Sequence, residues 1–155
     1  MKINQSLFED MSAMYMQLYG FPPLTANIYT YLLFDYEHEG ITFEELVETT
    51  QASKSSVSNS LNRLLESNYI EFFTKIEERK RFYRVNKSIF RIQFINQIHE
   101  LKTQNEILNR FFEHRCKTVS GNDADAEKIK LHIQLQEKTI ALYEQTLSSL
   151  NQLNN

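Results

Sequence analysis

The segment from residue 41 to residue 85 constrains the fold more than any other part of the chain. Thr42 stands three residues before Glu45, the spacing of a capping box that opens a helix. Ser53 is a second N-cap candidate, and apolar residues spaced four and three apart follow it. From Tyr69 to Lys75 and from Arg81 to Val85 the chain takes on the alternating, aromatic-rich character of strands. Two short helices joined by a turn and followed by a hairpin indicate a winged helix-turn-helix.

Further helices are expected on both sides of this segment. An apolar stripe near the start comprises Phe8, Met11, Met14 or Tyr15, and Leu18. A second helix is expected from Leu24 to Tyr36, and another from about Ser88, while 118–123 holds Gly121 and turn-forming residues. We therefore predict a mainly α protein with a small β-hairpin wing. Its expected parts are an N-terminal dimerisation helix (1–20), the winged domain (21–87) and C-terminal helices (88–155).

The last helix has the most regular apolar pattern in the chain. Its spacings of four and three form a heptad seam with one polar interruption. The seam is Ile129, Ile133, Gln136, Ile140, Tyr143, Leu147 and Leu150. A second ridge beside it is Leu131, Leu135 and Leu142, which indicates that the helix contacts more than one neighbour. We predict that the seam, together with the N-terminal stripe, joins two copies of the chain into a homodimer.

The second of the two short helices is polar on the side away from its apolar residues. That side carries Ser55, Asn59 and Asn62, flanked by Ser56, Ser58 and Arg63. An Asn side chain can bond adenine N6 and N7 together, and Ser can contact bases or phosphates. Lys54 opposes the helix dipole in the first turn, and a phosphate would explain its place there. A solvated polar face is the alternative, but the turn before the helix and the hairpin after it favour DNA.

The charge distribution supports the same interpretation. Residues 53–91 contain nine Lys or Arg against four Glu, a net of +5, whereas residues 1–52 hold one Lys against eight acids, a net of −7. A basic segment in an acidic chain localises phosphate contacts. The predicted contacts with double-stranded DNA are Ser53, Lys54, Ser55, Ser56, Ser58, Asn59, Asn62, Arg63, and on the wing Arg79, Lys80 and Arg81.

Three motifs of the chain resemble a known family. Gly20-Phe21-Pro22, Ala26-Asn27-Ile28-Tyr29 and the run Ser53–Ser58 (SKSSVS) occur in the order and spacing of MarR-type bacterial regulators. The similarity is greatest to the GbsR-like branch and covers about two thirds of the chain. Glu77-Glu78 departs from the family, in which Gly-Asp is commoner before the Arg run. The resemblance implies a dimeric, cytoplasmic transcriptional regulator whose action is commonly relieved by a small molecule.

A small-molecule effector is expected where the winged domain meets the flanking helices. The chain has nineteen Phe and Tyr residues and no Trp. Candidates for an effector site are Tyr15, Tyr19, Tyr29, Phe90 and Phe94. Aromatic rings bind organic cations through cation–π contact, and the resemblance implies choline-type compounds, so an organic cation or an aromatic compound is expected. Ordinary packing of aromatic residues in the core is the alternative.

Nothing in the sequence indicates an enzyme. The four His residues show no metal-ligand spacing, and the Ser-rich run lacks a Gly-rich elbow or partner His, so we expect neither metal nor cofactor. Cys116 is the single cysteine, and the N-terminus has neither signal-peptide nor membrane-span character, so a cytoplasmic location is expected. The alternative function is a winged-helix module that binds protein and not DNA.

Overall fold

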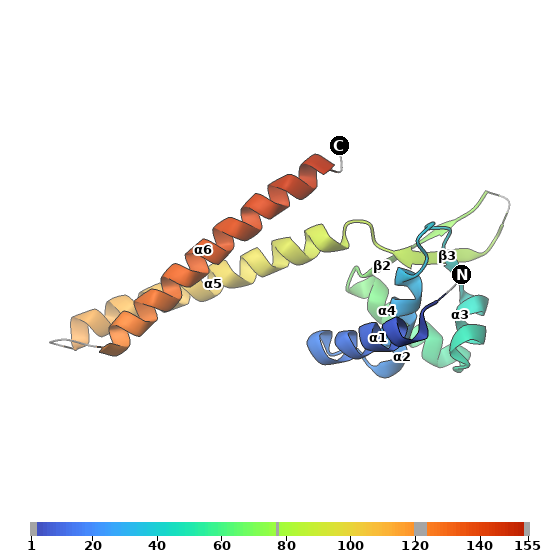
Figure 1. The fold of residues 1–155 in the computed structure, drawn as a ribbon, viewed down its shortest axis with the longest axis horizontal. Helices are drawn as coiled ribbons and strands as arrows, with labels where there is room; N and C mark the ends of the chain where they lie inside the picture. Colours follow the sequence, from blue (N-terminus) through green and yellow to red (C-terminus); the bar gives the residue numbers. More distant parts are fainter. Residues whose placement is uncertain (1–2, 77, 120–123, 154–155) are drawn as a thin grey trace. The chain divides into compact units, whose positions relative to one another are not determined.

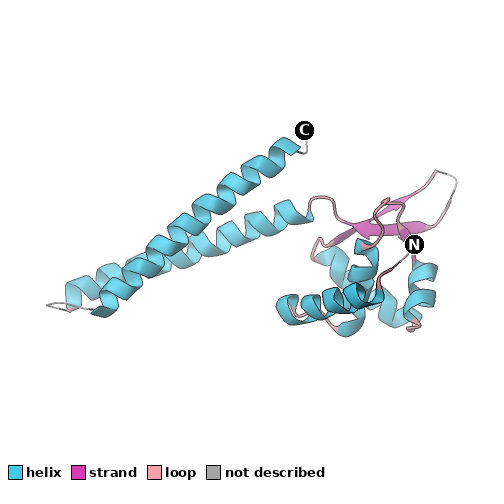
Figure 2. Ribbon diagram, in the orientation of Figure 1, coloured by secondary structure: helices cyan, strands magenta, loops and turns pink. Residues whose placement is uncertain are grey.

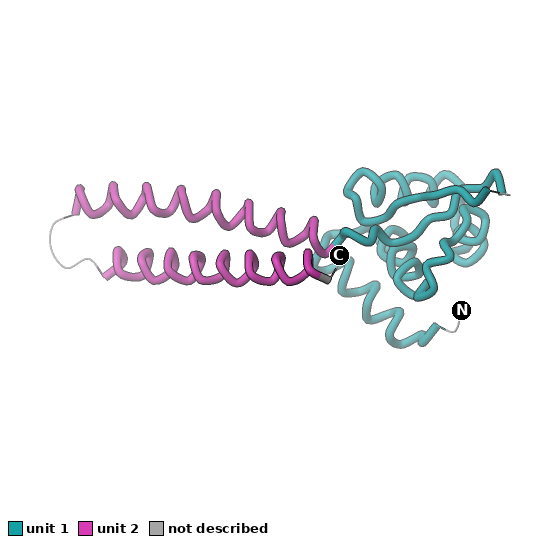
Figure 3. The backbone as a smooth tube through the Cα atoms, turned by 90° about the horizontal axis from the view of Figure 1, so that it is seen from above, with its two compact units in different colours: residues 1–89 teal, residues 90–155 magenta. Residues whose placement is uncertain are grey.

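The chain forms two compact units, residues 1–89 (unit 1) and residues 90–155 (unit 2), shown in Figure 3. The structure is a computed structural model that describes residues 3–76, 78–119 and 124–153.

Unit 1 is a winged helix-turn-helix preceded by one helix (Figures 1 and 2). Its elements are α1 (Gln5–Tyr19), α2 (Pro23–Leu33), β1 (Ile41–Thr42), α3 (Phe43–Thr50), α4 (Lys54–Glu66), β2 (Ile70–Thr74) and β3 (Arg81–Val85). The three strands form an antiparallel sheet in the order β1-β3-β2. The predicted fold is therefore confirmed, with the addition of β1, which at two residues is too short to show an alternating pattern.

The two helices of the helix-turn-helix begin at the predicted caps. The Thr42 hydroxyl accepts a hydrogen bond from the Glu45 N–H at 3.2 Å, and the Glu45 carboxylate accepts one from the Thr42 N–H at 2.8 Å. Gln51, with φ +51°, ends α3 in the left-handed conformation. The Ser53 hydroxyl then accepts from the Ser56 N–H at 3.2 Å and starts α4. The left-handed backbone of Gln51 and the side-chain cap of Ser53 define the turn between α3 and α4.

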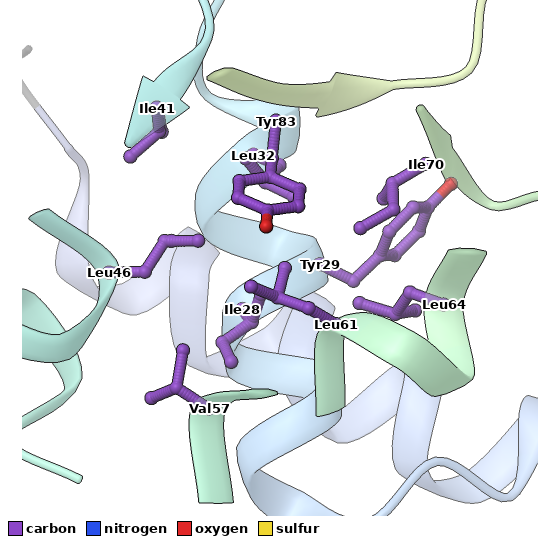
Figure 4. Packing of buried hydrophobic residues seen from close by; sticks show 10 residues of the cluster. All are labelled: Ile28, Tyr29, Leu32, Ile41, Leu46, Val57, Leu61, Leu64, Ile70 and Tyr83. Carbon is purple, nitrogen blue, oxygen red and sulfur yellow. The ribbon is translucent and has the colours of Figure 1, made fainter. Parts of the chain in front are cut away.

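The core of unit 1 brings α2, α3, α4 and the sheet together (Figure 4). Ten buried residues form it: Ile28, Tyr29, Leu32, Ile41, Leu46, Val57, Leu61, Leu64, Ile70 and Tyr83. All of the apolar residues that mark one face of α4 in the sequence lie in this cluster. The burial of that face directs the opposite, polar side of α4 outward.

The second helix ends earlier than predicted. α2 stops at Leu33, whereas the sequence pattern extended it to Tyr36. Asp35 follows the helical spacing, but its carboxylate accepts hydrogen bonds from the Glu39 and Gly40 N–H groups at 3.3 and 2.8 Å. A side chain that bonds to nearby backbone offers an alternative to continuing the helix. The turn it forms leads the chain into β1.

Gly40 lies against the base of the wing in a position that only glycine suits. Its φ is +79°, and a Cβ there would lie 2.7 Å from Cε1 of Phe73 on β2 and 2.8 Å from Cβ of Phe82 on β3. Gly20 offers a comparison within the same unit. Its φ is +65°, but a Cβ there would meet no atom within 4 Å.

Unit 2 consists largely of two antiparallel helices, α5 (Ile89–Thr118) and α6 (Ala124–Leu153). The predicted break after Thr118 is confirmed, although residues 120–123 lie outside the described residues. Close to the start of α5 and the end of α6, the Arg91 side chain donates to Asn151 at 3.1 Å, and the ring centres of Phe94 and Tyr143 are 5.2 Å apart.

The heptad seam of α6 is predicted to contact a second copy, and the residues in the middle of the seam pack within the chain. Ile133 and Ile140 are buried, and Gln136 Nε2 donates to Gln104 Oε1 of α5 at 3.2 Å. The apolar pattern of one helix does not show which helix it packs against. The sequence therefore could not distinguish packing within the chain from packing between two copies. The second ridge is instead exposed: Leu131, Leu135 and Leu142 are each at least 60% accessible.

We expect Gly40→Ala to destabilise unit 1 by about 2 kcal/mol or more, because strain at positive φ adds to the clash with Phe73. Gly20→Ala, the matched control, should cost about 1 kcal/mol, since it adds only the conformational strain. Urea unfolding followed by circular dichroism measures both. Equal losses would show that the Phe73 ring moves aside at no cost.

We also expect Gln136→Leu to stabilise unit 2 by roughly 1–2 kcal/mol. Gln136 is buried, and its Oε1 has no donor among the described residues, so the substitution removes a desolvated acceptor. Gln104 is exposed and can bond to water instead. Gln134→Leu, at an exposed position on the same helix, should leave the thermal midpoint nearly unchanged. A lower midpoint for Gln136→Leu would contradict this expectation.

Candidate nucleic-acid interface

The polar residues predicted to contact DNA lie together on the exposed side of α4. Lys54, Ser55, Ser56, Asn59, Asn62 and Arg63 are exposed, Ser58 is half-buried, and Ser53 is the exposed N-cap. The face is rich in amide and hydroxyl groups, with a cation in its first turn and another in its last. Its chemistry suits contacts with both base edges and phosphates.

The packing of α4 into the core and against α2 fixes the direction in which this face points. Val57, Leu61 and Leu64 are at most 2% accessible. Beside them the Thr25 hydroxyl of α2 donates to the Ser60 hydroxyl at 3.2 Å in a buried contact. Ser60 was not predicted as a functional residue, and its role is to satisfy a polar group where α4 crosses α2. The helix is therefore held by both apolar contacts and one specific hydrogen bond.

Three hydroxyl groups at the start of α4 form a small network. The Ser53 oxygen lies 3.0 Å from the Ser55 oxygen and 2.8 Å from the Ser56 oxygen. The Ser53 oxygen also accepts the Ser56 N–H that caps the helix. A contact of Ser55 with a base would therefore exchange its bond to Ser53 for one to DNA. The amide of Asn59 is exposed farther along the same face.

Cations are held over aromatic rings along the wing. The register pairs Phe73 with Phe82 and Phe72 with Tyr83, which places these two pairs on opposite faces of the hairpin. Lys75 Nζ lies 4.2 Å from the centre of the Phe82 ring, and the Arg81 guanidinium carbon lies 4.7 Å from that of Phe72. Arg79 and Lys80 are exposed at the tip. Residue 77 lies outside the described residues.

One arginine of the wing, Arg84, has both of its partners within the hairpin. The Arg84 guanidinium lies 4.6 Å from the centre of the Phe73 ring, and its Nε donates to Glu71 Oε1 at 2.7 Å. Arg84 was not predicted as a DNA contact, and these partners give it a role in holding the strands together. Lys75 was also not predicted. Its position over Phe82 depends on the strand register, which the sequence leaves open.

The wing cations are close enough to α3 to affect its capping carboxylate. Hydrogen bonds from Thr42 lower the pKa of Glu45, and the charges of Lys80 and Lys75 lower it further. The positive charge of the wing therefore extends to the start of α3. Glu45 remains bonded to the helix cap and does not form an ion pair with either lysine among the described contacts.

The predicted effector residues divide between the two units. In unit 1, Tyr15, Tyr19 and Tyr29 pack with Phe21 and Tyr69 into one aromatic cluster. The centres of Tyr15 and Tyr29 are 4.8 Å apart, and burial is the main cause that raises the pKa of both phenols. Rings in such mutual contact form a packed joint between α1 and the winged domain.

Phe90 and Phe94 belong to unit 2. Phe90 is exposed, while Phe94 lines an open cavity of about 300 Å³ together with Leu142, Tyr143 and Thr146. The five predicted residues therefore do not converge on one site within either unit. The cavity is lined by Phe94 alone among them.

The structure also bears on metal binding, on the single cysteine and on membrane-spanning helices. Among the described residues, no three His, Cys, Asp or Glu side chains are grouped to hold a metal ion. Cys116 is exposed with a free thiol. In the part of the chain that the structure describes, no helix has the length and apolar character needed to span a membrane.

Comparison with known proteins places the winged domain in a family. A sequence profile of the MarR family matches residues 19–81. No protein of curated function matches the chain. A crystal structure described as a transcriptional regulator is 16% identical and covers 96% of this chain and 97% of its own, with a TM-score of 0.61. That likeness shows a shared fold over both units.

Two further solved structures have lower TM-scores. The S. aureus MepR–DNA complex is 13% identical, covers 86% of this chain and 88% of its own, and has a TM-score of 0.43. A MarR/EmrR family transcriptional regulator from Acinetobacter sp. ADP1 is 18% identical, covers 90% and 89%, and has a TM-score of 0.42.

The profile match covers the helix-turn-helix and most of the wing, the same segment whose caps, core and register are described above. The family consists of transcription regulators and not of enzymes, which confirms the expectation that this chain is not an enzyme. Assignment to the GbsR-like branch stays a prediction. Residues 19–81 are a winged helix-turn-helix domain that matches the MarR family.

Proposed function

We propose that this protein is a homodimeric transcriptional regulator that binds a palindromic operator in double-stranded DNA through α4 and the wing. The observation that carries the proposal is the exposed face of α4, where amide, hydroxyl and cationic groups lie opposite a fully buried apolar face. A MarR-family domain with this face has the means to contact both base edges and phosphates. As a bacterial regulator of chromosomal genes, it would act in the cytoplasm.

The side chains divide by chemistry into two roles. Asn59 and Ser55 are proposed to contact base edges, since an amide can bond adenine in two places and a short hydroxyl can approach closely. Lys54 and Arg63 at the ends of α4, and Arg79, Lys80 and Arg81 on the wing, are proposed to hold phosphates. Ser53, Ser56, Ser58 and Asn62 complete the contact surface.

Two exposed apolar stripes support the homodimer. On α1, Leu7, Met14 and Leu18 are exposed and Met11 is half-buried, at spacings that place all four along one side of the helix. Phe8 and Tyr15 point to other partners, Phe34 and Tyr29, so the predicted N-terminal stripe is divided between two sides. On α6 the exposed ridge of Leu131, Leu135 and Leu142 replaces the seam as the proposed contact between copies.

A dimer gives the operator its symmetry. Two copies related by a two-fold axis present two α4 helices, which can occupy major grooves about 34–36 Å apart on a palindromic site. One winged domain offers few contacts, whereas two double them. We propose that the regulator acts as a repressor by occupying such a site.

The proposed effector is an organic cation or an aromatic compound. A ligand changes operator affinity only by binding differently to two arrangements of the dimer. The cavity beside Phe94 and Tyr143 has the aromatic lining that such a compound needs. A thermal-shift screen of choline-like and aromatic compounds tests this, provided that each hit is then assayed for its effect on operator binding.

The alternative is a winged-helix module that binds protein. Selection of bound duplexes from a random pool, followed by affinity measurements over a salt series, separates the two functions. Enrichment of one sequence, with an affinity that falls steeply as salt rises, supports the regulator. Failure to bind any duplex at low salt would leave the interaction module as the better account.

We expect Asn59→Ala to weaken binding to the selected duplex by roughly 1–3 kcal/mol and to change binding to random duplex little. Arg79→Ala should weaken binding to both duplexes alike and reduce the salt slope by about one unit. Fluorescence anisotropy with labelled duplexes measures both variants. Equal losses on the two duplexes for Asn59→Ala would mean that α4 does not distinguish bases.

We expect light scattering at micromolar concentration to give about twice the chain mass, which is 18.4 kDa. Leu135→Glu should shift the protein toward the monomer, because it places a charge in the exposed ridge of α6. Gln134→Glu adds the same charge at a neighbouring exposed position and should leave the mass unchanged. A strict monomer for the unaltered chain would contradict the proposal.

A further inference from the structure

The loop at the end of the wing carries an exposed apolar side chain. Ile76 is fully exposed in the loop between β2 and β3, which extends beyond the helices of unit 1 in Figures 1 and 2. A hydrogen bond of 3.1 Å from the Glu78 N–H to the Lys75 carbonyl closes a turn at this place. Its neighbours in the described chain, Lys75, Glu78, Arg79 and Lys80, are all charged and exposed. A single exposed Ile is common on protein surfaces, so its meaning depends on its surroundings.

On each face of the hairpin a cation lies over an aromatic ring near the loop that carries this Ile. Lys75 lies over Phe82 on one face, and Arg81 lies over Phe72 on the other. Contact with a ring restricts the cation, so less side-chain freedom is lost when it binds a phosphate. The end of the wing therefore combines an exposed apolar residue with a positive charge held over a ring on each face of the hairpin.

This arrangement matches the minor groove of duplex DNA. The groove is about 6 Å wide, and a row of phosphates borders it on each side. A hairpin that enters edge-on directs one face toward each strand. Lys75 and Arg81 would then lie toward opposite rows of phosphates, with Ile76 toward the base edges between them.

We propose that Ile76 contacts base edges in the minor groove next to the α4 site and selects A·T pairs there. This inference rests on the proposed function, and it adds a specificity residue that the predicted contacts lack. A G·C pair places the N2 amino group of guanine in the minor groove, and A·T pairs have no such donor. An apolar side chain that covers this amino group removes its water without supplying an acceptor. Ile76 therefore excludes G·C pairs and accepts A·T pairs.

Inosine provides the decisive substitution in the DNA. An inosine·C pair lacks the 2-amino group, so its minor groove resembles that of A·T while its major groove resembles that of G·C. The selected duplex is prepared with A·T, G·C or inosine·C pairs outside each half-site. We expect the unaltered protein to bind the A·T and inosine·C duplexes alike and the G·C duplex about tenfold more weakly.

The matched protein variant is Ile76→Ala. We expect it to bind all three duplexes alike, with an affinity for the A·T duplex reduced severalfold, because the apolar contact is lost. Its salt slope should equal that of the unaltered protein, since no phosphate contact is removed. Tyr36→Ala, which truncates an exposed side chain in the loop after α2, is the control and should retain the discrimination.

Two results would overturn the inference while the proposed function stands. One is an Ile76→Ala variant that still discriminates between flanks. The other is an inosine·C duplex that binds as weakly as the G·C duplex. Failure of the unaltered protein to bind any duplex would instead overturn the proposed function, and this inference with it.

Discussion

The burial of one face of α4 against α2 determines what the rest of unit 1 can do. Val57, Leu61 and Leu64 are removed from water, and the Thr25–Ser60 hydrogen bond fixes where α4 crosses α2. Burial of each such side chain contributes roughly 1.5–3 kcal/mol, which is large beside the 5–15 kcal/mol that stabilises a typical domain. The polar face of α4 therefore needs no stabilising contacts of its own, and its amide and hydroxyl groups are left for a partner.

The elements that the sequence predicted well are those whose signal is local. The capping box at Thr42, the cap at Ser53 and the strand from Arg81 to Val85 depend on residues a few positions apart, and the structure confirms them. The polar face of α4 follows from helical periodicity alone. Each of these features depends only on residues that are close together in the sequence.

The remaining features depend on contacts between distant residues. The end of α2 is set by Asp35 bonding to a loop, and β1 exists because Ile41 and Thr42 pair with Tyr83 and Phe82. The heptad spacing of α6 predicted an apolar seam, but the burial of its middle residues within the chain depends on α5, which is distant in the sequence. In the same way, the positions of Lys75 and Arg81 over rings require the register of β2 and β3.

The aromatic cluster that joins α1 to the winged domain gives the chain an internal optical reporter. The chain has no Trp, so its near-ultraviolet absorption comes mainly from its eight Tyr residues. Burial raises the pKa of Tyr15 and Tyr29, and the Tyr29 phenol stays protonated well above the range in which exposed phenols ionise. In an alkaline spectrophotometric titration, the number of tyrosines that ionise at a higher pH than exposed phenols reports how many phenols this cluster still buries. Loosening of α1 can thereby be followed without a label.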